Sequence, residues 1–139
     1  MLGEFFAARP EDLDDELIDH GPFERLRTVE AKGLSSITIA TLGEILGAGS
    51  YDDLEQRSAE GPEGGTNEDA GVFGVPTEIR DALAAADDLT AVAEEWVATE
   101  EMARDEWQQQ EALEVLRELA ELARQARADS RELWYWWSL

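Results

Sequence analysis

The last nine residues of this 139-residue chain constrain its fold more than any other segment. They contain the aromatic run Leu133-Trp134-Tyr135-Trp136-Trp137. Side chains alternate along a strand, so a strand here has leucine, tyrosine and tryptophan on one face and two tryptophans on the other. Both faces are then apolar and both need covering. We therefore expect an inner strand of a small sheet, beside residues 72–75 or 25–30. The alternative is a helix that is apolar all round, which also demands burial.

The same run also fits a binding surface, because Trp and Tyr are enriched among the residues that dominate protein interfaces. On this interpretation Trp134, Tyr135 and Trp136 are candidate partner-binding residues. Burial in the core is the favoured interpretation. Contact between identical subunits, giving a homo-oligomer through the C-terminal aromatic segment, and contact with a foreign protein are the alternatives.

The charge of the chain is extreme: 33 acidic residues face 11 basic ones, a formal net charge of −22. Such a charge repels itself and opposes compaction, although a chain of this length can bury a real core. Lys32 is the only lysine. This composition is typical of a high-GC genome or of a salt-rich cytoplasm. The second origin fits only in part, because Glu outnumbers Asp by 21 to 12.

Several classes of function are not expected, because the residues that they require are absent from the sequence. Cysteine is absent, which excludes disulfides and thiolate chemistry. Residues 1–6 lack the cationic start and apolar core of a signal peptide, and no apolar run approaches the length of a membrane span. We therefore expect a cytoplasmic protein without membrane association. A nucleic-acid partner is not expected either, because phosphate binding needs clustered cations.

Neither a metal nor a cofactor is expected. His20 is the only histidine, and a bundle di-metal site needs Glu-x-x-His pairs on facing helices. The segment around Asn67, Glu68 and Asp69 offers oxygen ligands but lacks the spacing of a calcium loop. No Gly-x-Ser-x-Gly and no phosphate-binding loop is present.

Helical periodicity governs most of the remaining chain. Helices are expected from Pro10 to residue 20, and at 34–46, 50–54, 76–86, 89–103 and 108–128. For 34–46 a strand is the competing interpretation, because the segment is rich in β-branched residues. Short extended segments are expected at 23–31 and 72–75, and residues 58–71 are expected to form a flexible, glycine-rich loop. The predicted fold is mainly α: a single acidic domain spanning 1–139, with about five or six antiparallel helices and a small β element that includes the C-terminal segment.

The acidity itself suggests a function. A strongly negative small domain attracts a basic partner from a distance and binds it faster at low salt. Nuclease toxins hold phosphates in basic clefts, and their inhibitors are often small acidic proteins. We therefore expect a non-enzymatic interaction domain, an immunity or inhibitor protein that neutralises a basic toxin. Asp52 and Asp53, in the first turn of the helix at 50–54, are candidate contacts.

Two alternatives remain from the sequence. In the first, the chain is a salt-adapted cytoplasmic protein whose acidity serves only solvation. In the second, it is a small enzyme that uses carboxylates alone, which requires a pocket with two buried acids from different helices.

Overall fold

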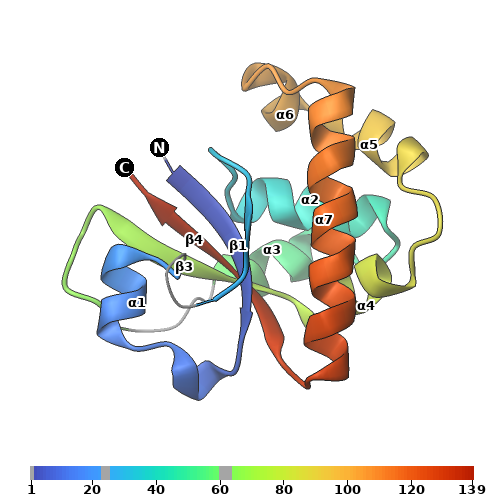
Figure 1. Ribbon diagram of the computed structural model, residues 1–139. Helices are drawn as coiled ribbons and strands as arrows, with labels where there is room; N and C mark the ends of the chain where they lie inside the picture. Colours follow the sequence, from blue (N-terminus) through green and yellow to red (C-terminus); the bar gives the residue numbers. More distant parts are fainter. Residues whose placement is uncertain (1, 23–25, 60–63) are drawn as a thin grey trace.

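A four-stranded antiparallel sheet forms the centre of the fold, with helices on both of its faces (Figure 1). The computed structural model describes residues 2–22, 26–59 and 64–139. The strands are β1 (Leu2–Ala8), β2 (Thr28–Glu30), β3 (Ala70–Val75) and β4 (Glu132–Ser138), in the order β2-β1-β4-β3. In the described residues the helices are the 3-10 turn η1 (Pro10–Asp12), α1 (Asp15–His20), α2 (Ser36–Ile45), α3 (Tyr51–Ala59), α4 (Thr77–Ala85), α5 (Thr90–Val97), α6 (Glu100–Arg104) and α7 (Gln109–Ala128).

The prediction of a mainly helical fold is therefore confirmed only in part. Seven α-helices are present in the described residues, but the sheet is larger than the small β element expected. The predicted inner strand is confirmed. β4 pairs along its whole length with β1, from Leu2 opposite Ser138 to Ala8 opposite Glu132. On its other side it pairs with β3, which includes the expected segment 72–75.

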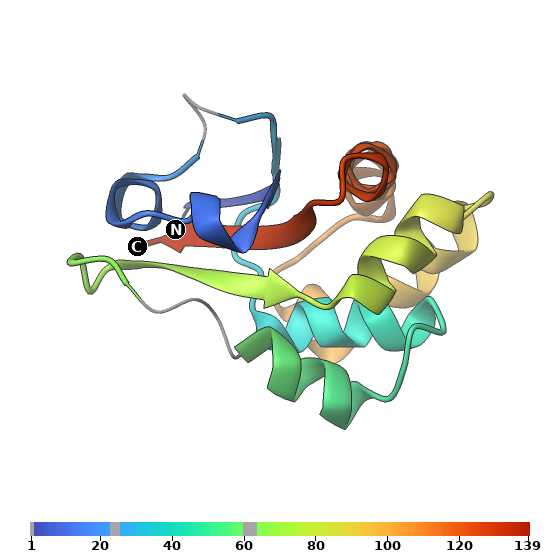
Figure 2. The same cartoon turned by 90° about the horizontal axis from the view of Figure 1, so that it is seen from below.

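Alternation along β4 divides the apolar side chains between two clusters, as the strand pattern requires. Tyr135 and Leu133 join Phe5 in the larger cluster, where α3, α4 and α7 contact the sheet and α2 and α5 pack against these helices. Trp136 joins Phe6 in a smaller cluster on the other face, which is covered by α1. Figure 2 shows α1 set apart from the other helices. Both faces of β4 are thus covered.

Three of the five tryptophans have a backbone partner for the indole nitrogen. The Nε1–H groups of Trp96, Trp134 and Trp136 donate to the backbone carbonyls of Thr38, Ala8 and Ile18. An indole N–H buried without a partner is costly. These bonds therefore let a tryptophan-rich strand lie at the centre of the sheet.

Helix boundaries differ from the expected ones where a local side chain competes with the helix. Pro10 begins only the 3-10 turn, and α1 starts later because the Asp14 carboxylate caps it by accepting from the Leu17 N–H at 2.8 Å. The helix expected over 89–103 is two helices, since Thr99 is extended and its hydroxyl bonds the Trp96 carbonyl at 2.6 Å. The helix at 50–54 continues to Ala59.

Residues 65–67 of the predicted flexible loop are hydrogen bonded to α1; residues 60–63 of that loop lie outside the described part. Asp15 accepts from the Gly65 N–H at 2.9 Å. Asp19 accepts from the Thr66 hydroxyl at 2.7 Å and from the Thr66 and Asn67 N–H groups. These bonds hold the pKa of Asp19 below its usual 3.8, with the Thr66 hydroxyl contributing most. Two α1 carboxylates thus attach the segment that leads into β3.

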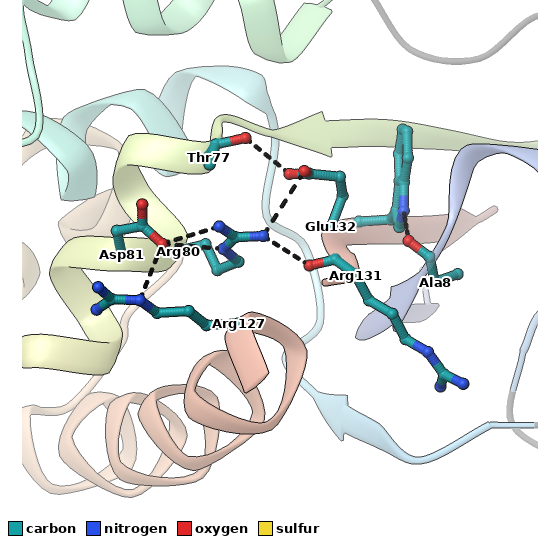
Figure 3. A network of polar contacts seen from close by, with 8 residues as sticks. Ala8, Thr77, Arg80, Asp81, Arg127, Arg131 and Glu132 are labelled. Carbon is teal, nitrogen blue, oxygen red and sulfur yellow. Dashed lines mark hydrogen bonds and ion pairs between the residues drawn. The ribbon is translucent and has the colours of Figure 1, made fainter. Parts of the chain in front are cut away.

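A polar network joins α4 to the start of β4 (Figure 3). Arg80 donates to the Arg131 carbonyl at 2.8 Å, and also contacts the carboxylates of Asp81 and Glu132. The Thr77 hydroxyl donates to Glu132 at 2.7 Å. The Arg80 side chain is only 12% exposed, so its charged hydrogen bonds are largely shielded from water. These bonds hold α4 against residues 131 and 132 and thereby fix where β4 begins after α7.

Candidate cation-binding groove

A concave groove of about 560 Å³ lies beside the N-terminal half of α7. It lies where α6 meets α7, near the top of the view in Figure 1. We call it the acidic groove. Its lining comes from the end of β2, the β2–α2 connection, the α6–α7 connection and α7: Glu30, Ala31, Lys32, Gly33, Asp105, Glu106, Trp107, Glu111, Glu114, Val115 and Glu118.

One wall is a stripe of carboxylates along α7. Glu111, Glu114 and Glu118 are three and four residues apart, which places them on one face of the helix. The opposite face of α7 is buried in the larger cluster through residues such as Leu116 and Ala123. The amphipathic sequence of α7 therefore fixes the direction of the stripe, because turning it away from solvent would expose the apolar face.

The second wall is the turn that follows α6, and its backbone is strained. Glu106 has a φ of 60°, in the left-handed region that favours glycine. Its N–H bonds the Ala103 carbonyl and the next N–H, of Trp107, bonds the Met102 carbonyl, both at 3.1 Å. This pair of bonds is the Schellman ending of a helix, in which the left-handed position is usually glycine. A glutamate at this position keeps a carboxylate in the groove at a conformational cost.

Trp107 supplies the aromatic surface of the groove. Its half-buried ring stacks on Trp96, with ring centroids 6.5 Å apart and an interplanar angle of 27°. Trp96 is fully buried and is itself held by the bond from its indole to Thr38. The buried Trp96 ring thus supports the half-buried Trp107 ring, and part of the Trp107 surface faces the groove.

The third wall, residues 30–33, is fixed from the sheet by Tyr135. The phenol donates to the Ala31 carbonyl at 2.7 Å and accepts from the Leu34 N–H at 3.1 Å. Burial raises the pKa of Tyr135 to about 12, so the phenol keeps its proton at any physiological pH. The hydroxyl approaches β1 closely at Gly3, where a Cβ would lie 1.7 Å from it. The aromatic strand thereby positions one wall of the groove.

The groove is strongly negative. It is lined by six carboxylates and one ammonium group, and Lys32 lies 3.6 Å from Glu30. Three arginines join parts of the fold outside the groove: Arg57 pairs with Glu78, Arg27 with Glu121 and Arg127 with Asp81. An open, negative groove with an aromatic surface can hold an arginine or lysine side chain, through ion pairs and a cation–π contact.

Comparison of the chain with family models, with curated proteins and with solved structures gives no match. The case for function therefore rests on the geometry of the chain itself. Within residues 2–22, 26–59 and 64–139, no helix has the length and apolarity needed to cross a bilayer. The same residues contain no group of three or more histidines and carboxylates placed to hold a metal ion.

The residues singled out from the sequence lie outside the groove. Tyr135 and Trp136 are buried at 0% and 4% exposure, and Trp134 is half-buried. Asp52 and Asp53 are exposed in the first turn of α3. The role of all five in partner binding stays a prediction.

Sequence reasoning did not find the groove as a site. The outward glutamates of α7 were readable from its periodicity. Their meeting with residues 30–33, about 80 positions earlier in the chain, was not, because a single sequence carries no signal for that contact.

Proposed function

We propose that this chain is a non-enzymatic binding protein for a basic protein partner, and that the acidic groove is its binding site. The observation that carries the proposal is the convergence of six carboxylates, from three separate segments, around one half-buried tryptophan. Groups of one charge repel one another, so their convergence lowers the stability of the free protein. A bound cationic partner would remove this repulsion.

The overall charge supports the same partner. A net charge of −22 attracts a cationic protein over the distance of a Debye length and raises its association rate at low salt. On contact, carboxylates on three walls can each receive a guanidinium or ammonium N–H, while Trp107 receives the flat face of a guanidinium. One such partner is a basic toxin whose cleft is covered by this surface. The chain is then the inhibitor or immunity protein of that toxin.

The test uses octa-arginine as the probe and two variants with the same loss of charge. Glu114→Gln/Glu118→Gln removes two groove carboxylates. Glu94→Gln/Glu95→Gln removes two exposed carboxylates of α5 outside the groove lining. We expect the groove variant to bind about three- to tenfold more weakly at low salt, in line with the small energy of each exposed ion pair, and the α5 variant to bind nearly as the wild type does. Isothermal titration calorimetry at several salt concentrations measures both.

A third variant, Asp52→Asn/Asp53→Asn, decides between the groove and the α3 surface. If it weakens binding while the groove variant does not, the groove is the wrong site. Equal weakening by all three variants means that only total charge matters, and then the groove has no special role.

Salt adaptation predicts a different behaviour. A circular dichroism titration with KCl separates the two functions, because a salt-adapted chain unfolds below molar salt. The binding function predicts a cooperative fold in dilute buffer. The carboxylate enzyme would need two buried acids; the polar side chains buried in the described residues are Thr38 and Ser58.

A further inference from the structure

Glu4 lies in the centre of the sheet with one carboxylate oxygen unsatisfied. Its side chain is half-buried, and its Oε2 atom is buried without a hydrogen-bond partner. Central strands rarely bury such a group, because a carboxylate that loses water without gaining a donor is destabilised in its charged form. The fold contains no donor placed to compensate it among the described residues, so its position needs an explanation.

The residue directly across the β1–β2 pair is another carboxylate. Glu4 lies opposite Glu30 in the register, so both side chains leave the same face of the sheet. Opposed like charges are destabilising in a sheet. Glu30 is also a lining residue of the acidic groove, where Lys32 lies 3.6 Å from its carboxylate. Glu4 is therefore coupled to the groove through one neighbour.

The other groups around Glu4 do not relieve it. On β4 its partner in the register is Trp136, which carries no charge, and the nearby Tyr135 phenol is neutral. α1 packs on Trp136, but its carboxylates at positions 15 and 19 accept hydrogen bonds from residues 65–67. Burial first, and then the charge of Glu30, raise the pKa of Glu4 above its ordinary 4.5.

We propose that Glu4 is a proton-linked regulator of the acidic groove: losing its proton strengthens the binding of a cationic partner, and binding of that partner expels the proton. This inference rests on the proposed function of the groove. When Glu4 is protonated, Glu30 and Lys32 pair without interference. When Glu4 is charged, the two opposed carboxylates require additional positive charge, which an arginine or lysine of the partner supplies beside Glu30. Linkage makes the two effects equal in size.

The first experiment tests the coupling without any partner. NMR titration of the Glu4 side-chain carboxyl in the wild type and in Glu30→Gln measures its pKa directly. We expect an elevated pKa in the wild type and a lower one in the variant, because the opposing charge is gone. An ordinary pKa for Glu4, or the same pKa in both proteins, overturns the inference.

The second experiment measures octa-arginine affinity between about pH 4.5 and pH 7 in the wild type, in Glu4→Gln and in the exposed control Glu95→Gln. We expect the wild type and the control to gain about fivefold more affinity over this range than Glu4→Gln does, the low end of typical coupling between sites. Urea denaturation of Glu4→Gln at both ends of the range shows whether the variant is folded during the measurement.

The outcomes separate the two proposals. If octa-arginine binds and Glu114→Gln/Glu118→Gln weakens it, while Glu4→Gln follows the same pH profile as the wild type, the regulatory role of Glu4 is wrong and the groove stands. If octa-arginine does not bind the wild type at low salt, the proposed function fails, and the NMR titration alone then reports on the Glu4–Glu30 pair.

Discussion

Replacement of Glu106 by glycine should make the protein more stable and a weaker binder at once. The left-handed backbone of Glu106, at a φ of 60°, costs a residue with a side chain about 1–2 kcal/mol. Glycine avoids most of this cost. It also loses more conformational entropy on folding, which offsets the gain in stability by about 0.5–1 kcal/mol. The backbone contribution of Glu106→Gly is therefore a gain of about 0.5–1 kcal/mol. Removal of one of six like charges adds a smaller, salt-dependent gain.

A second helix end provides the matched control. Ser130, after α7, has a φ of 56°, and the following Arg131 N–H bonds the Ala126 carbonyl at 2.8 Å. Ser130→Gly thus relieves the same backbone strain without changing any charge and without touching the groove. Glu106→Gln changes the charge without changing the strain. Together the three variants separate the two contributions.

Urea denaturation followed by circular dichroism, at low salt and at about 0.5 M NaCl, measures the free energy of unfolding of each variant. We expect Glu106→Gly and Ser130→Gly to be stabilised alike at high salt, and Glu106→Gln to return to the wild-type value there. Octa-arginine binding should fall in Glu106→Gly and Glu106→Gln and stay unchanged in Ser130→Gly. A destabilised Glu106→Gly would refute the strain argument, and unchanged binding would remove Glu106 from the site.

The other predictions concern the framework of the groove and the segment that α1 holds. Tyr135→Phe should lower the free energy of unfolding by about 1–3 kcal/mol, because the two backbone groups that the phenol bridges stay buried without a partner; Tyr51→Phe, at the other tyrosine, is the control. In alkali the wild type should lose stability as the pH rises from 10 towards 12, since the unfolded chain ionises this phenol first, and Tyr135→Phe should show a smaller loss. Gly3→Ala should cost about 3 kcal/mol or more in thermal unfolding, because its Cβ has no room beside the phenol. Asp19 has a lowered pKa, so its contribution is present above its ordinary 3.8 and is lost as the pH falls through the folded value; NMR shifts of the Thr66 and Asn67 amides should report this release, and Asp19→Asn should not show the transition.

The sequence was most informative where a segment carried its own constraint. The run 133–137 is apolar on both faces, so it could only be an inner strand or a buried helix, and β4 lies between two partners. α7 was readable from its 3.6-residue period, and the helix expected at 34–46 is α2. In each case the deciding residues lie within one element.

β1 was missed for the opposite reason. Leu2–Ala8 contains Gly3 and Glu4, which interrupt its apolar pattern and weaken strand formation. What makes it a strand is the partner β4, more than 120 residues later in the chain. Glycine is required there by the Tyr135 ring, and this requirement is visible only in three dimensions. The acidic groove was missed likewise, because its walls come from segments with no local relation.

The pairing of β1 with β4 also sets when this sheet can form. β1 cannot pair with β4 until residues 132–138 have been synthesised, more than a hundred residues after β1 itself. Until then the larger cluster lacks Tyr135 and the smaller one lacks Trp136, and the nascent chain holds its leucines among many unneutralised carboxylates. Proteolysis that removes only the last eight residues should therefore unravel the sheet as a whole, so that an intact C-terminal strand and a finished groove always come together.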